Sequence, residues 1–170
     1  HGTDSQVILI TTSEEMLEKV QAEVDLQLIK LTRKDIAAKS LENSKLILVN
    51  NKEEAMDLSN AYAPEHLIIE TSDYAELSKN VINAGSVFLG SYTPESAGDY
   101  ASGTNHTLPT HGYAMAYNGV NLDSYNRKVT FQEITPEGIR QIGNAVEIMA
   151  ENEHLDAHKN AMKLRVDDVK

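Results

Sequence analysis

Short apolar runs alternate with amphipathic segments along the first half of the chain. The first two runs predict strands buried within a sheet and two more continue the pattern; they occupy residues 6–11, 45–49, 66–70 and 86–89. The intervening segments predict helices at residues 12–28, 32–41, 52–61 and 74–82. Strands that alternate with helices are typical of βαβ units. The pattern therefore predicts an α/β fold, with a mostly parallel sheet flanked by helices in an incomplete Rossmann-like arrangement.

The last part of the chain predicts helices. Residues 129–134 form one more strand-like run. A Thr-Pro-Glu sequence then supplies an N-cap and a helix-favouring first turn, so we expect a helix over residues 135–152 and a second amphipathic helix over 155–166. The expected organisation is an α/β portion, residues 1–134, and a helical tail, residues 135–170, that acts as a lid or as an arm reaching another subunit.

Composition excludes several classes of protein. The chain has 170 residues and a formal net charge of −11, so its overall field disfavours nucleic acid and anionic lipid as partners. It contains no Cys, which leaves His, Asp, Glu and Gln to hold any metal. No stretch approaches the length of about eighteen apolar residues that a membrane-spanning helix needs. We therefore expect a soluble, cytoplasmic protein.

A polar segment, residues 90–119, shows little hydrophobic periodicity, and loops of that length are usually functional or disordered. It contains Asp99 and His106, a carboxylate and an imidazole that suit Zn²⁺ or another divalent ion. An Asx-turn at Asp99 and an exposed His106 would produce the same pattern. The segment is therefore a candidate metal site, and residue spacing alone does not distinguish the metal site from the turn.

An acid and a base adjoin at the start of the third predicted strand. Glu65 and His66 follow Pro64, which ends the preceding helix. Sites in α/β proteins gather at strand ends. Here His66 suits a general base and Glu65 suits the activation of a water molecule. A solvated glutamate and a capping histidine would fit the same pattern.

Glu153, His154 and His158 lie at the junction of the two predicted tail helices. The two histidines would share a helix face if both are helical. The alternative is that these histidines have no ligand and only interact with the helix dipole, as basic residues at a helix end commonly do. Neither GxGxxG after a strand nor GxxxxGK[ST] occurs, so no standard nucleotide site is encoded.

Four strings of residues resemble the carboxyl-terminal half of the histidinol dehydrogenases: HGTDSQVILIT, APEHL, NAGSVFLGSYTPESAGDYASGTNHTLPT and AHKNAMKLRV, in that order. The resemblance extends over essentially the whole chain, and GDYASGTNHTLPT is a long and specific string. It implies a zinc-containing, NAD-dependent enzyme that oxidises L-histidinol through L-histidinal to L-histidine, the last steps of histidine biosynthesis.

The resemblance also implies roles for individual residues. His66 matches the family's base, which takes the alcohol proton, and Glu65 matches the group that activates the attacking water. Zinc ligands are implied at His1, Asp99 and His158.

The implied substrate contacts come from both parts of the chain: His66, Asp99, Tyr100, His106, Glu153 and His158. In the family the two terminal helices cross into the partner subunit, so the resemblance implies a homodimer with swapped tails. Glu153 and His158 would then complete the neighbour's site.

The chain also departs from the family pattern. The family's remaining zinc ligand, a Gln three residues before the HG motif, would lie upstream of His1, and the nicotinamide-binding domain has no counterpart here. We therefore expect no NAD-binding residues and a chain that is incomplete for catalysis by itself. A non-catalytic zinc- or imidazole-binding module derived from the family is an alternative function, and a plain acidic α/β interaction domain is a third.

Overall fold

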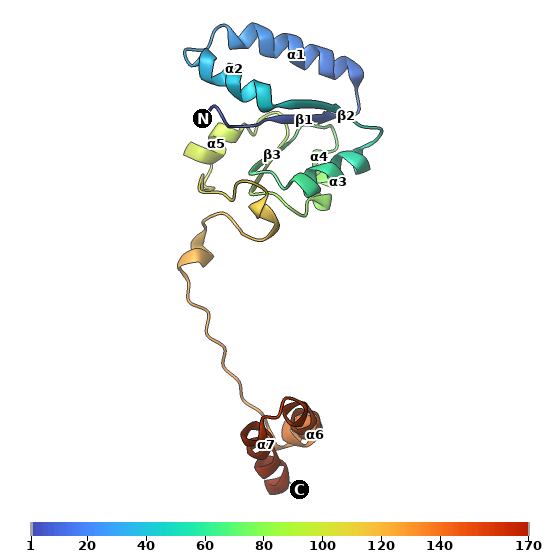
Figure 1. Ribbon diagram of the computed structural model, residues 1–170, viewed down its shortest axis with the longest axis vertical. Helices are drawn as coiled ribbons and strands as arrows, with labels where there is room; N and C mark the ends of the chain where they lie inside the picture. The colour runs from blue at the N-terminus through green and yellow to red at the C-terminus, as the bar shows by residue number, and fades with distance from the viewer. Residues whose placement is uncertain (1, 170) are drawn as a thin grey trace. The chain divides into compact units, whose positions relative to one another are not determined.

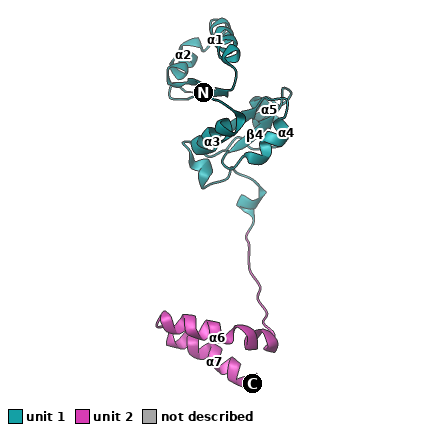
Figure 2. Ribbon diagram, turned by 90° about the vertical axis from the view of Figure 1, so that its right-hand side faces the viewer, with its two compact units in different colours: residues 1–126 teal, residues 127–170 magenta. Residues whose placement is uncertain are grey.

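The strands form two parallel sheets of two strands each in the computed structural model, which describes residues 2–169. Both sheets belong to a first compact unit, residues 1–126, and a second unit spans residues 127–170 (Figure 2). The strands and α-helices of the first unit are β1 (Ile8–Thr11), α1 (Glu14–Leu28), α2 (Lys34–Asn43), β2 (Lys45–Leu48), α3 (Lys52–Tyr62), β3 (His66–Ile69), α4 (Tyr74–Leu77), β4 (Ser86–Leu89) and α5 (Glu95–Tyr100). The predicted α/β fold class is confirmed.

Helices connect the strands of each sheet, as parallel pairing requires. The chain runs from β1 through α1 and α2 to β2, with Ile8 opposite Lys45. Both helices lie on one face of this sheet (Figure 1). In the second sheet the chain runs from β3 through α4 to β4, with His66 opposite Ser86. The parallel arrangement is therefore present in two short sheets.

The buried core of the first unit is small, and its apolar members include Val49, Met56, Ala63, Ile69 and Phe88. Leu46 and Leu48 of β2 are 41% and 49% exposed. The prediction of a buried strand at residues 45–49 is therefore wrong for most of the run. The physical reason is that β2 pairs with β1 alone among the described strands, so few neighbours cover its side chains.

The second unit is a pair of packed helices, α6 (Pro136–Asn152) and α7 (Asp156–Asp168), which confirms both predicted tail helices. The strand predicted at residues 129–134 is wrong: these residues have no regular secondary structure, and Phe131 is exposed. The run has apolar residues, but no described strand lies beside it to form a hydrogen-bonded ladder. Throughout the described chain, no helix is both long and apolar enough to cross a membrane.

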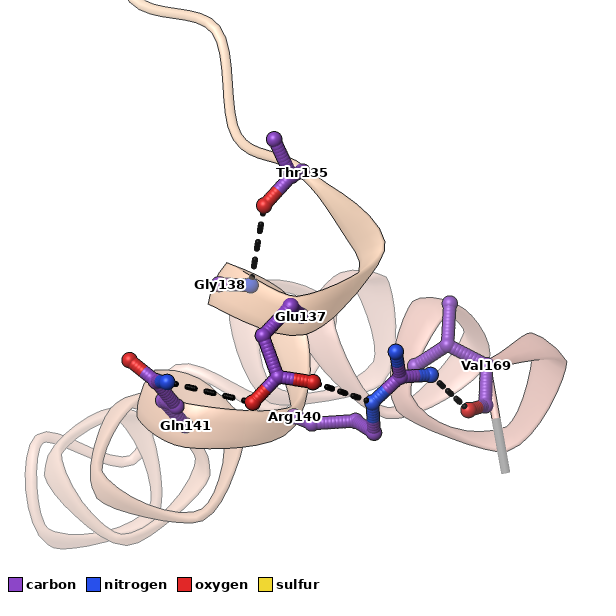
Figure 3. Close-up of polar contacts among 6 residues, drawn as sticks. All are labelled: Thr135, Glu137, Gly138, Arg140, Gln141 and Val169. Atoms are coloured by element: carbon purple, nitrogen blue, oxygen red, sulfur yellow. Dashed lines mark hydrogen bonds and ion pairs between the residues drawn. The ribbon is translucent and has the colours of Figure 1, made fainter.

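Polar contacts join the start of α6 to the end of α7 (Figure 3). Thr135 caps α6, because its Oγ1 accepts a hydrogen bond from the N–H of Gly138 at 3.1 Å. Arg140 donates to the Glu137 carboxylate at 2.9 Å and to the carbonyl oxygen of Val169 at 2.7 Å. The N-cap predicted from the Thr-Pro-Glu sequence is therefore confirmed.

Close packing of α6 against α7 depends on Gly143, which is buried and lies beside Val166. We expect Gly143→Ala to lower the stability of the second unit, because its Cβ would collide with the Val166 side chain. Overpacking costs about 1–3 kcal/mol, which exceeds the gain of about 1 kcal/mol in helix propensity. Urea unfolding followed by circular dichroism measures the effect. The neighbouring exposed variant Asn144→Ala is the control, and a Gly143→Ala chain as stable as that control would contradict the prediction.

Candidate functional site

Three side chains from β3 and α5 converge in the first unit. The Nε2 atom of His66 lies 3.6 Å from Oε1 of Glu95 and 3.9 Å from Oδ1 of Asp99. One potential ligand atom from each residue lies within 4.8 Å of the other two. Within residues 2–169, this is the one group of three or more such residues close enough to share a metal ion.

The start of β3 is set by the sharp end of α3. Ala63 adopts a left-handed conformation, with φ 53°, and its N–H donates to the carbonyl of Ser59 at 2.9 Å. Pro64 follows, and the residue before a proline is disfavoured in a helix. The predicted helix end at Pro64 is therefore confirmed, and the chain turns directly into β3 with His66 as its first residue.

The position of α5 brings two carboxylates close to the imidazole ring of His66. Glu95 and Asp99 are four residues apart and therefore share a helix face. Gly98 is buried against Phe88 of β4: a Cβ on this glycine would lie 2.5 Å from Cε1 of the ring. The Phe88 and His66 ring centroids are 6.0 Å apart. Close approach of α5 to β4 thus places the carboxylates beside His66.

The Nε2 atom of His66 is buried and has no hydrogen-bond partner among the described residues. The oxygens of Glu95 and Asp99 that face it are beyond hydrogen-bond distance. Buried polar atoms in proteins nearly always have a partner, and exceptions often mark functional sites. This nitrogen is therefore suited to a ligand, a metal ion or an anionic hydrogen-bond partner.

Carboxyl groups crowd around Glu95. Burial raises the pKa of its carboxyl above the ordinary value, and a hydrogen bond with Asp99 raises it further. The negative charges of Asp99 and Glu65 act in the same direction, whereas the charge of His66 lowers this pKa. Glu65 is therefore close enough to influence the cluster electrostatically. This crowding favours a cation or a proton among the carboxylates.

The cluster has the donor set of a metal site and the pair of groups needed for proton transfer. One imidazole nitrogen and two carboxylate oxygens suit a divalent ion such as Zn²⁺. Alternatively, Asp99 alone contributes to a metal site while the neighbouring His66 acts as a base. His66 and Asp99 are 27% and 15% exposed, so both remain accessible to a small molecule.

The structure brings together some of the predicted site residues of the first unit. Glu65, His66 and Asp99 lie in or beside the cluster. Tyr100 ends α5 with an exposed side chain, and His106 is exposed in the following bend, outside the cluster. Their roles as substrate contacts therefore stay predictions.

The remaining predicted residues lie elsewhere. Glu153 and His158 belong to the second unit, and both are exposed. His154 precedes α7 in a left-handed conformation, with φ 59°, so it does not share a helix face with His158. His1 lies outside the described residues. The zinc-ligand roles of His1, Asp99 and His158 and the substrate-contact role of Glu153 therefore stay predictions.

Sequence reasoning missed Glu95. The sequence predicts residues 90–119 as a segment without periodicity, whereas the structure has a helix at α5 and a 3₁₀ turn at Tyr113–Met115 within it. The available signal was the four-residue spacing from Glu95 to Asp99, which places both on one face once the segment is helical. A six-residue helix is too short to produce a clear hydrophobic repeat.

Comparisons with known proteins agree with the strings found in the sequence. A family model described as histidinol dehydrogenase matches residues 1–166. The chain belongs to the histidinol dehydrogenase family. Among relatives in this family, histidinol dehydrogenase from Bacteroides fragilis is 65% identical over 170 residues. The histidine biosynthesis trifunctional protein of Saccharomyces cerevisiae is 50% identical over 168 residues, which are 98% of this chain and 21% of that protein.

The structural comparison gives the same family. The crystal structure of histidinol dehydrogenase from Elizabethkingia anophelis matches with a TM-score of 0.88 and 50% sequence identity, covering 99% of this chain and 39% of that one. The match to the B. fragilis histidinol dehydrogenase covers all of this chain and 40% of that protein. The chain therefore spans about 40% of the length of these histidinol dehydrogenases.

Proposed function

We propose that the chain is a segment of an NAD-dependent, zinc-containing histidinol dehydrogenase. This enzyme oxidises L-histidinol through L-histidinal to L-histidine and acts in cytoplasmic histidine biosynthesis. The observation that supports the proposal best is the approach of His66 to Asp99, at 3.9 Å, from separate elements of the fold. The residue expected to act as base thus lies beside the residue expected to bind the metal. Membership of this chain in the histidinol dehydrogenase family supports the same reaction.

Proton transfer is the proposed role of His66. In the first oxidation its imidazole takes the proton of the substrate hydroxyl while the carbon-bound hydrogen leaves with its electron pair. NAD, which the remainder of the enzyme would bind, supplies the hydride acceptor. In the second half of the reaction Glu65 takes a proton from the water that adds to the aldehyde. His66, protonated in the first oxidation, returns its proton to the aldehyde oxygen as the hydrate forms, and it then takes the proton of the hydrate hydroxyl as a second hydride leaves to a second NAD.

Metal binding is the proposed role of Asp99, together with His1 and with His158 of the partner's swapped tail. The Asp99 carboxylate fits this role, because it is half-buried beside an unpartnered imidazole nitrogen. When bound, zinc supplies a centre that orients the amine and imidazole of the substrate. His106, Tyr100 and Glu153 are proposed substrate contacts. A homodimer follows from the shared site.

A chimera tests the proposal directly. In it, these 170 residues replace the matching 40% of the B. fragilis histidinol dehydrogenase. We expect the zinc-loaded chimera to form NADH when L-histidinol is added. Tight zinc and histidinol binding without turnover would instead support the non-catalytic module. A chimera that neither binds zinc nor forms NADH would contradict both and leave an interaction domain.

The metal ligand set gives a sharper prediction. Asp99→Asn in the chimera is expected to weaken zinc binding by at least about tenfold, because the variant loses an anionic oxygen ligand. Zinc bound per chain after dialysis against a graded chelator measures the effect. Asp57→Asn, at an exposed position of α3, is the matched control. Equal zinc affinity of the two variants would count against Asp99 as a ligand.

A further inference from the structure

We propose that Glu95 is a positioning residue for His66, acting as the anionic partner that orients the imidazole and stabilises the cation formed when the ring takes the substrate proton. This role rests on the proposed function. It adds a residue to which neither the sequence motifs nor the family resemblance assigned a part.

Geometry singles out Glu95 from the neighbouring acids. Its Oε1 lies 3.6 Å from the Nε2 of His66, closer than the Asp99 oxygen at 3.9 Å. That nitrogen is buried and has no hydrogen-bond partner in the described part of the chain. A buried N–H or imidazolium needs an acceptor. A small rotation of the Glu95 side chain, which is 36% exposed, would supply one.

The two carboxylates of α5 have different proposed roles. Asp99 is the less exposed of the two and is the proposed metal ligand. A carboxylate held by a metal has less negative charge to offer a neighbouring imidazole. Glu95 has no such commitment, and the four-residue spacing on α5 keeps both side chains on the same side of the ring. Glu95 is therefore free to act on His66.

The imidazole is also confined by packing. The Phe88 ring lies 6.0 Å from the His66 ring, centroid to centroid, at an interplanar angle of 35°. Both side chains project from the same face of the β3–β4 sheet, because Ile68, two residues after His66, pairs with Phe88. Packing against Phe88 restricts the plane of the imidazole, and a carboxylate at Nε2 fixes its rotation within that plane.

The Glu95 carboxylate would act during proton transfer to His66. As the hydroxyl proton moves to Nδ1 of His66, the ring nitrogen that Glu95 does not engage, the carbon–hydrogen bond breaks and its electron pair goes to NAD, so the alcohol is oxidised and NAD is reduced. His66 becomes a cation in this step. An adjacent carboxylate attracts the cation more than the neutral ring, and a base oriented by a third group is the usual arrangement of such sites. The contribution of Glu95 should therefore appear in the rate.

The zinc-loaded chimera described above is the test system. We expect Glu95→Gln to lower kcat for L-histidinol by about 10- to 100-fold, the loss typical of a partner that orients a functional histidine. KM and zinc content should stay within about twofold of the parent, since neither substrate nor metal contact is removed. Glu95→Asp keeps the charge and should recover part of kcat. Glu14→Gln removes the corresponding exposed acid at the start of α1 and is the matched control.

The outcomes separate the two proposals. A parent chimera that forms no NADH from L-histidinol would overturn the proposed function and this role with it. In an active chimera, an unchanged kcat in Glu95→Gln would overturn the role of Glu95 alone. A kcat loss accompanied by loss of zinc, or shared by Glu14→Gln, would also overturn it, since it would indicate a metal ligand or a general helix effect.

Discussion

His66→Ala lowers kcat for L-histidinol by about 10²- to 10⁴-fold, if the imidazole is the base in both oxidations. KM should change far less, because proton transfer contributes to the transition state rather than to substrate binding. The half-buried ring lies at the first position of β3 and does not belong to the buried core, so the variant should fold. Steady-state kinetics of the zinc-loaded chimera, with zinc content measured in the same samples, provides the comparison.

Glu65→Gln is the informative companion to this variant. It should leave the first oxidation largely intact and slow the second, so that L-histidinal accumulates, whereas His66→Ala should slow both. Chemical trapping of the aldehyde distinguishes the two patterns. Equal losses in kcat and in substrate affinity for His66→Ala would contradict its role as base.

Gly98→Ala is expected to disrupt the whole cluster. The added Cβ would lie 2.5 Å from Cε1 of Phe88 and 3.1 Å from Oγ1 of Thr104. Phe88 is buried, so the ring has little room to move, and α5 must shift away from β4. Such overpacking costs about 1–3 kcal/mol. A displacement of about 1 Å of Glu95 and Asp99 relative to His66 would lower kcat by about 10²-fold.

The direction of this effect distinguishes packing from helix propensity. Alanine favours a helix over glycine by about 1 kcal/mol, so without the Phe88 contact Gly98→Ala would stabilise α5. Zinc affinity, kcat and urea unfolding of the chimera measure the outcome. The double variant Gly98→Ala, Phe88→Leu should recover part of the zinc affinity by making room for the methyl group. A fully active, more stable Gly98→Ala chimera would show that α5 does not depend on this contact.

Several elements of the fold were predictable because their signals are local. The apolar runs and the amphipathic segments between them predicted the strands and the longer helices, since side-chain periodicity follows directly from backbone geometry. Pro64 predicted the end of α3 for the same kind of reason. The predicted strand at residues 129–134 failed because an apolar run becomes a strand only when another strand supplies hydrogen bonds.

The candidate site was predictable residue by residue but not as an arrangement. Glu65, His66 and Asp99 were recognised from the sequence, whereas Glu95 was not, because its six-residue helix is too short to show a repeat. His154 and His158 would share a helix face only if both were helical, and the left-handed backbone at His154 excludes it from the helix. Such local departures from regular geometry leave no distinct mark on residue spacing.

The sequence by itself determined the α/β class, the order of the four strands and the longer helices, the family, and the candidate acid and base at the start of β3. The tertiary structure decided which side chains meet. Glu95 and Asp99 face His66 because Gly98 lets α5 approach Phe88 on the neighbouring strand. That contact joins residues distant in the chain, so its existence depends on the packing of two elements and not on the local preferences of either one.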